Sequence, residues 1–181
     1  PDKNTTGSIV VDPANPVYDS REGCNAIIKT ATNTLLYGCS NAFIPQSVTA
    51  IDTYAFEGIR NLKEISIPDG VVKMGHSAFR DCKNLEKVHF GAGITEIQPS
   101  QFLDSHKLSE ITVSPANSKY DSRNNCNAVI ETATGILVIG GNKSTVPDGV
   151  TTIGSEAFRF RDELKKYDIK FVFAGSEYGV N

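Results

Sequence analysis

The chain repeats itself with a period of about 23 residues, and this repetition constrains its fold more than any other feature. Four segments align when each begins at the apolar residue before a Pro or Gly. They are "IPQSVTAIDTYAFEGIRNLKEIS", "IPDGVVKMGHSAFRDCKNLEKVH", "FGAGITEIQPSQFLDSHKLSEIT" and "VPDGVTTIGSEAFRFRDELKKYD", at residues 44–66, 67–89, 90–112 and 146–168. Such repeats bury their apolar faces by stacking, so the pattern predicts a solenoid.

Four positions of each repeat stay apolar while their neighbours vary, as expected of a core that runs through stacked coils. Each buried Phe of such a ladder is worth about 1.5–3 kcal/mol over exposure. The third repeat departs from the pattern with Gln101, where the others have Ala. The four sets are Val48, Val71, Ile94 and Val150; Ile51, Met74, Ile97 and Ile153; Phe56, Phe79, Phe102 and Phe158; and Leu62, Leu85, Leu108 and Leu164.

Local patterns predict the elements of one coil. "LKEISI", "LEKVHF" and "LSEITV" alternate apolar and polar residues, so each predicts a short strand, and stacking would place these strands side by side and parallel. "IPDG" predicts a turn. "SAFRDCKNL", from Ser77, predicts a single helical or 3-10 turn on the other side of the coil, with Ala78 and Phe79 inward and Arg80 and Asp81 outward.

A longer repeat overlies the short one: residues 9–68 align without a gap on 111–170, with about 27 of the 60 positions identical. In "CNAIIKTATNTLLYGC" and "CNAVIETATGILVIGG", two β-prone runs flank a turn that contains Asn33 or Gly135, residue types that tolerate the left-handed region. We expect an inserted β-hairpin in each copy, within modules at 13–43 and 115–145.

"YDSREGCNA", repeated as "YDSRNNCNA", has two readings. Asp19, Ser20, Arg21 and Cys24 could form a nucleophilic site, or Asp and Ser could shape an Asx-type turn into the hairpin, with Tyr18 and Cys24 packed. Catalysis needs an oriented base, and no His recurs with the motif, so we favour the turn. The spacing of a calcium loop is not met either. The sequence therefore predicts no catalytic residue, metal site or cofactor.

The remaining Cys and His residues give no clear site. His76, His89 and His106 occupy three different positions of the repeat, so they do not stack into a metal cluster. Cys24 and Cys39 flank the first hairpin and could form a disulfide, although Gly141 stands opposite Cys126 in the second copy. The sequence leaves both alternatives for this pair open.

Composition bounds the class of protein. The 181 residues carry a net charge of -3, so the chain lacks the excess of basic residues typical of nucleic-acid-binding proteins. No apolar run approaches the roughly 18 residues of a membrane span. We interpret residues 1–181 as one solenoid domain. Because "PDKNTTGS" has neither an initiator Met nor an apolar signal core, we expect a fragment or processed form of a longer protein.

The pattern I-P-x-x-V-x-x-I-x-x-x-A-F-x-x-C-x-x-L-x-x-I resembles the BspA-like leucine-rich-repeat family of bacterial surface proteins. "NPVYDSREGCNAIIKTATNTLLYGC" resembles a hairpin module of that family, and the resemblance covers about residues 9–169. It implies a right-handed solenoid with a parallel β-sheet on the concave face. It also implies an extracellular location on the bacterial cell surface, and recognition of a protein or glycoprotein on host or neighbouring cells.

The outward side chains of the concave strands are the candidate partner-binding residues. The face they form is mixed in charge and lacks aromatic residues, so no stacking platform for sugars or bases is expected. We therefore expect a non-enzymatic protein-binding or adhesion module; the alternatives are a structural spacer or stalk and, third, a carbohydrate-binding module. The candidates are Glu64, Ser66, Lys87, His89, Glu110, Thr112, Lys166 and Asp168.

Overall fold

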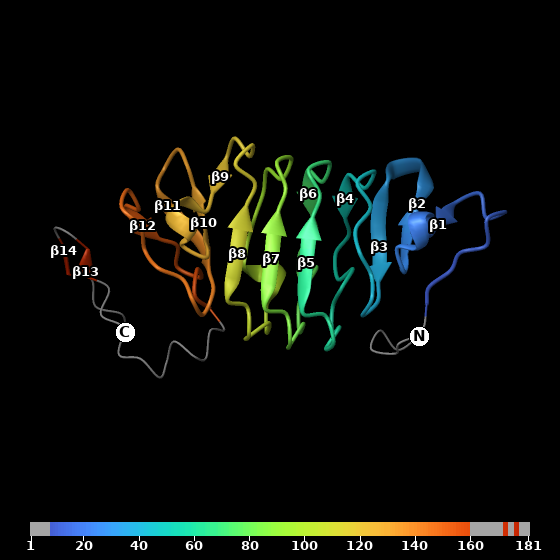
Figure 1. The fold of residues 1–181 in the computed structure, drawn as a ribbon, viewed down its shortest axis with the longest axis horizontal. Coiled ribbons are helices and arrows are strands. Elements are labelled where there is room, and N and C mark those ends of the chain that lie inside the picture. The colour runs from blue at the N-terminus through green and yellow to red at the C-terminus, as the bar shows by residue number, and fades with distance from the viewer. Residues whose placement is uncertain (1–7, 160–171, 174–175, 178–181) are drawn as a thin grey trace.

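The computed structural model describes residues 8–159, 172–173 and 176–177, and Figure 1 shows their arrangement. Short strands and 3-10 helices alternate along the chain. The strands are β1 (Tyr18–Asp19), β2 (Ala26–Lys29), β3 (Thr34–Gly38), β4 (Ala50–Ile51), β5 (Glu64–Ile67), β6 (Lys73–Met74), β7 (Lys87–Phe90), β8 (Glu110–Val113), β9 (Tyr120–Asp121), β10 (Ala128–Glu131), β11 (Ile136–Gly140), β12 (Thr152–Ile153), β13 (Val172–Phe173) and β14 (Ser176–Glu177). The 3-10 helices are η1 (Arg21–Gly23), η2 (Thr30–Thr32), η3 (Pro99–Phe102) and η4 (Arg123–Asn125).

Three strands, one from each of three successive coils, form a parallel sheet in the middle of the molecule (Figure 1). β5 pairs with β7 and β7 with β8, and each residue lies beside the one 23 positions later: Glu64 beside Lys87, and Lys87 beside Glu110. The predicted strands and their parallel order are confirmed. The repeat period is therefore also the register of the sheet, which lines up equivalent side chains across it.

The ladder of Phe residues forms the centre of the core. Phe56, Phe79 and Phe102 are each no more than 1% exposed. The rings of Phe56 and Phe79 stack with centroids 5.0 Å apart, and those of Phe79 and Phe102 with centroids 5.5 Å apart. Phe90, from the end of β7, meets the last ring edge-on at 6.0 Å. Stacked aromatic rings with these separations add to the free energy that their burial already supplies.

The side of the coil opposite this sheet differs from the expectation. Ala78 and Phe79 point inward as predicted, but the segment from Ser77 forms successive turns instead of a helical turn. Ser77 has φ of 53° and Asp81 has φ of 55°, and Tyr54 and Gly58 are also left-handed one coil earlier, at 60° and 73°. Left-handed residues cannot continue a right-handed helix, so the turn is interrupted at each of them.

In the third repeat the helical expectation holds. η3 begins at Pro99, whose fixed φ suits the first position of a helix, and Gln98 and Gln101 cap each other there. Gln101, the residue that departs from the Ala pattern, is 1% exposed. Its side chain accepts a hydrogen bond from the Gln98 N–H at 2.9 Å and donates one to the Met74 carbonyl at 3.0 Å. The buried amide is thus satisfied and adds a bond between coils.

Each end of the central sheet carries an antiparallel strand pair. β2 pairs with β3 at one end and β10 with β11 at the other, and the turns between them hold Asn33 at φ 50° and Gly135 at φ 70°, left-handed as expected at these positions. β3 then continues sideways into parallel pairing with β4, and β4 with β6. The β2–β3 pair is therefore hydrogen-bonded to the stacked coils and lengthens their stack.

The two copies of the module differ at their tyrosine in a way that the sequence did not predict. Tyr120 is 4% exposed and its hydroxyl accepts a hydrogen bond from the Ile97 N–H of the coil before it. Tyr18, the equivalent residue, was expected to be packed but is 38% exposed. The physical reason is the neighbour: a coil lies in front of Tyr120, whereas no described residue occupies the matching place in front of Tyr18.

The Phe ladder predicts a large cost for its middle member. Phe79→Ala would leave a cavity between two stacked rings, and we expect the free energy of unfolding to fall by about 3–5 kcal/mol. Chemical denaturation measures the change. Tyr54→Ala, at a side chain that is 43% exposed on the same side of the coil, is the control and should cost much less. Equal unfolding midpoints for Phe79→Ala and wild type would contradict the ladder.

The duplication supplies a second, internally controlled prediction. Asn117 is 9% exposed and its amide donates to the Gly91 and Ile94 carbonyls of the preceding coil, at 3.0 and 3.1 Å. Among the described residues, the Asn15 side chain has only local bonds: its oxygen accepts from the N–H groups of Val17 and Tyr18.

We therefore expect Asn117→Ala to lower the free energy of unfolding by about 2–3 kcal/mol, and Asn15→Ala by under about 1 kcal/mol. Urea denaturation of the two variants provides the comparison. Equal costs would mean that the bonds between coils contribute nothing beyond the local turn.

Candidate functional site

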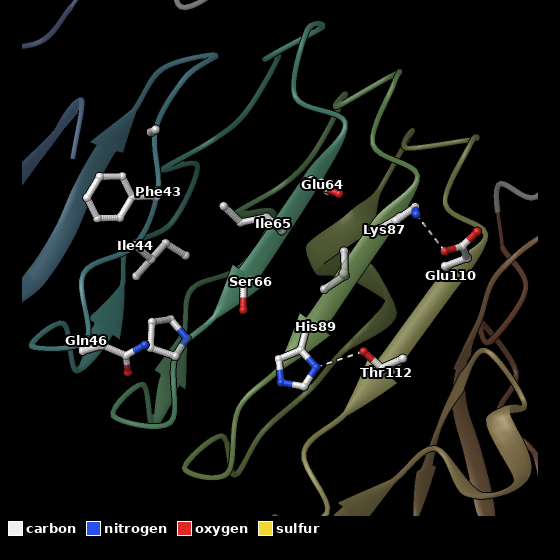
Figure 2. A pocket seen from close by; sticks show the side chains of 13 residues that line it. Phe43, Ile44, Gln46, Glu64, Ile65, Ser66, Lys87, His89, Glu110 and Thr112 are labelled. Carbon is white, nitrogen blue, oxygen red and sulfur yellow. Dashed lines mark hydrogen bonds and ion pairs between the residues drawn. The ribbon is translucent and has the colours of Figure 1, made fainter. Parts of the chain in front are cut away.

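A pocket of about 610 Å³ lies over the polar face of β5, β7 and β8, and Figure 2 shows its lining. The predicted partner-binding residues Glu64, Ser66, Lys87, His89, Glu110 and Thr112 all line it. The floor between them is made of Ile65 and Val88, which are mostly buried in the core below. The remaining two predicted residues, Lys166 and Asp168, lie outside the described residues.

One row of the pocket is a chain of alternating charges across the coils. The Lys143 ammonium lies 2.8 Å from one carboxylate oxygen of Glu110, and the Lys87 ammonium lies 3.2 Å from the other. The hydrogen bond from Lys143, followed by that from Lys87, lowers the pKa of Glu110, and the same contact raises the pKa of Lys143. Both groups are exposed, so these pairs fix the direction of side chains more than they stabilise the fold.

The second row consists of three polar side chains. Ser66, His89 and Thr112 occupy the same position in three successive coils. The Nδ1 atom of His89 and the Thr112 hydroxyl are 2.9 Å apart and share a hydrogen bond (Figure 2). Together with the hydroxyl of Ser66, these groups offer both donors and acceptors to a molecule lying across the strands.

Phe43 was missed by the sequence analysis, which expected this face to lack aromatic residues. Its ring is 44% exposed and lies at the edge of the pocket, next to Ile44 and near Gln46 (Figure 2). A signal was present: Phe43 precedes Ser66 by 23 residues, and so belongs to the same row as His89 and Thr112. Its position at the end of the expected hairpin module concealed that membership.

The repeated "YDSR" motif forms a turn tied by ionic hydrogen bonds. One carboxylate oxygen of Asp19 accepts from the backbone N–H of Arg21 at 3.1 Å and from its Nε at 2.7 Å; the other accepts from Arg21 Nη2 at 2.6 Å and from the Thr30 hydroxyl at 2.8 Å. The Arg21 hydrogen bond, with smaller help from Thr30, lowers the pKa of Asp19 to about 2. Arg21 also donates to Asn33 and Ser47, which joins the turn to the hairpin and the first coil.

The other members of the motif are also bound into the structure. The Ser20 hydroxyl accepts a hydrogen bond from the Val11 N–H at 2.9 Å. Cys24 is fully buried, and burial raises the pKa of its thiol, which disfavours the reactive thiolate. The second copy repeats the arrangement, with Arg123 Nε 2.8 Å from Asp121 and a lowered Asp121 pKa from the same cause. These contacts support the turn over the nucleophilic site.

The structure answers the question left open for Cys24 and Cys39, which are not joined by a disulfide. Cys24 and Cys39 are both buried and not bonded to each other. The Cys39 thiol instead lies 3.2 Å from the Asn25 carbonyl oxygen. Over the part of the chain that the structure describes, no group of three or more His, Cys, Asp or Glu side chains could hold a metal ion.

The Asp19–Arg21 contact makes stability depend on acid pH. The Asp19 pKa of about 2 lies below its ordinary value of 3.8, so its contribution is complete above about pH 4 and is lost as the pH falls toward 2. We expect Asp19→Asn to lower the free energy of unfolding at pH 7 by about 1–2 kcal/mol, with the difference from wild type narrowing between about pH 4 and 2.

Urea denaturation as a function of pH measures this dependence. The matched control is Glu22→Gln, which changes an exposed carboxylate of the same turn. A difference between Asp19→Asn and wild type that stayed constant from pH 7 to pH 2 would contradict the assignment.

Residues 30–134 match the profile of the BspA type leucine rich repeat region, in 6 copies. Comparison with curated proteins gives no significant match. Over the described residues, no helix is long and apolar enough to cross a membrane.

Several solved structures are similar to the chain. The pneumococcal vaccine antigen PcpA is 15% identical, with a TM-score of 0.48 over 62% of this chain and 34% of that one. A leucine rich cell surface protein from Faecalibacterium prausnitzii is 22% identical, with a TM-score of 0.43 over 62% and 38%. A leucine-rich repeat protein from Bacteroides ovatus is 21% identical, with a TM-score of 0.45 over 82% and 38%. The chain thus spans less than two fifths of the length of these three proteins.

Proposed function

Because the chain belongs to the BspA-type leucine-rich repeat family, we propose that it binds a protein partner through the polar face of β5, β7 and β8. This family consists of bacterial surface proteins that generally act as protein-interaction modules. In the proposal the chain is a non-enzymatic recognition or adhesion module, displayed outside the bacterial cell. Its partner is a protein or glycoprotein of a host or neighbouring cell.

The observation that carries the proposal is the pocket over the central sheet. Three in-register strands bring six polar side chains from three coils into one concave lining, with an exposed Phe beside them. The strands are held by the stacked core beneath, so these side chains keep their spacing without needing to be ordered by a partner. A preordered surface loses less conformational entropy on binding, which favours recognition over a plain solvated face.

The wider architecture completes the proposal. We take residues 1–181 as one right-handed solenoid, with repeats at 44–66, 67–89, 90–112 and 146–168 and modules at 13–43 and 115–145. The pocket face is then its concave side, to which Lys166 and Asp168 of the last repeat would add two further polar side chains. Affinity would come from several coils together, as is general for repeat proteins with extended binding surfaces.

A binding experiment tests the proposal against the structural spacer. The immobilised chain is incubated with solubilised surface proteins of cultured epithelial cells and of bacteria, and retained proteins are quantified by mass spectrometry. The test variant changes Glu64, Lys87, His89 and Glu110 together to Ala. The control variant changes Glu57, Arg80 and Asp104, which lie around a separate shallow hollow, to Ala.

We expect partner proteins to bind wild type and the control variant. They should bind the test variant at least about tenfold more weakly, while its circular dichroism spectrum stays as in wild type. Equal retention by the test variant and wild type would refute the polar face as the binding surface. Retention of nothing by wild type would favour the spacer.

A further inference from the structure

The row of charges in the pocket ends in a carboxylate without a cation of its own. Lys143 and Lys87 both direct their ammonium groups to Glu110, which lies between them. Glu64 comes next in the row, beside Lys87 in the register of the sheet. Its exposed carboxylate makes no ion pair or hydrogen bond with any residue in the described ranges. The alternation of charge along the row therefore stops at an unneutralised acid.

The Phe43 ring lies at this same end of the pocket. Its backbone is held firmly, since Ala42 and Ile44 on either side are buried and its N–H donates to the Cys24 carbonyl at 3.2 Å. In the second module, Thr145 occupies the same backbone position and donates to the Cys126 carbonyl at 2.9 Å. A Thr serves the architecture equally well there, so the exposed aromatic ring of the first copy is not required by the fold.

Glu64 and Phe43 line the same pocket, and the Ile65 side chain, which points into the core, is only 6% exposed. Figure 2 shows the Ile65 side chain between them, and all three residues line the pocket. Long cationic side chains bury their methylene stems along apolar surface while their charged ends stay solvated or paired. An exposed aromatic ring and a carboxylate in one pocket complement such a side chain, the ring through its apolar face and the carboxylate through its charge.

We propose that this end of the pocket binds an arginine or lysine side chain of the partner protein. Its stem lies on the Phe43 ring, and its charged group meets the Glu64 carboxylate. The inference rests on the proposed function and narrows it to a partner that presents a basic side chain. Arginine is favoured, since its planar guanidinium stacks on aromatic rings and pairs with a carboxylate through two hydrogen bonds.

A nuclear magnetic resonance titration of the full chain tests the inference with a defined probe. The probe is the peptide acetyl-Gly-Arg-Gly-amide, and the matched control is the same peptide with citrulline, which has nearly the same shape without the charge. We expect saturable shifts of the Phe43, Glu64 and Ile65 amides with the arginine peptide, at a roughly millimolar dissociation constant, and about a tenfold weaker response to citrulline.

The second copy supplies the residue types for two substitutions. Phe43→Thr and Glu64→Lys install the residue types that the chain itself has at Thr145 and Lys166. We expect Glu64→Lys to abolish the response to the arginine peptide and Phe43→Thr to weaken it several-fold. Glu57→Lys makes the same charge change outside the pocket and should leave the response as in wild type.

Three outcomes would overturn the inference: an equal response to the two peptides, shifts outside the pocket, or loss of the response in Glu57→Lys as well. None of them bears on the proposed function, because retention of protein partners by the polar face is measured separately.

Discussion

The exposed surface of this molecule depends on the stacking of buried side chains from one coil onto the next. The rings of Phe56, Phe79 and Phe102 lie in nearly parallel planes, 5.0 and 5.5 Å apart, close to the spacing of neighbouring strands in a sheet. Because the ring and strand positions belong to the same repeat, the stack and the sheet impose one register. The register set by the core therefore fixes which outward side chains lie side by side.

This constraint explains why equivalent side chains of successive coils line the pocket in rows. A residue type placed on the outward side of one strand meets its counterpart 23 positions away, so a change of residue type between repeats becomes a pattern in space. Glu64, Lys87 and Glu110 alternate in sign across the sheet, and Glu64 forms no ion pair with any residue that the structure describes. The recognition surface is thus encoded in the differences between repeats, whereas the fold is encoded in the positions they share.

Periodicity made much of the fold predictable from the sequence. Prediction failed where the structure depends on local backbone conformation or on which coil lies next to a residue. The apolar positions, the central strands and their parallel order came from the repeat alone. The turns at Ser77 and Asp81 did not, since left-handed φ values at Ser and Asp are not marked by residue type as they are at Gly. Tyr18 and Tyr120 have nearly the same local sequence, yet among the residues that the structure describes only Tyr120 has a coil packed against it. Phe43, the last residue of the expected module at 13–43, was not assigned to the row of Ser66, His89 and Thr112.

The register of the central sheet can be measured directly with paired cysteine substitutions. Ser66 and His89 lie side by side in the structure, whereas Ser66 and Lys87 are offset by two residues along the strand. Neighbours across parallel strands are within the distance that a disulfide spans, and the offset pair lies beyond it. Oxidised Ser66→Cys/His89→Cys, examined by peptide mass spectrometry with and without reductant, should be cross-linked, and Ser66→Cys/Lys87→Cys should not. Cross-linking of the offset pair in place of the direct pair would contradict the 23-residue register on which the surface rests.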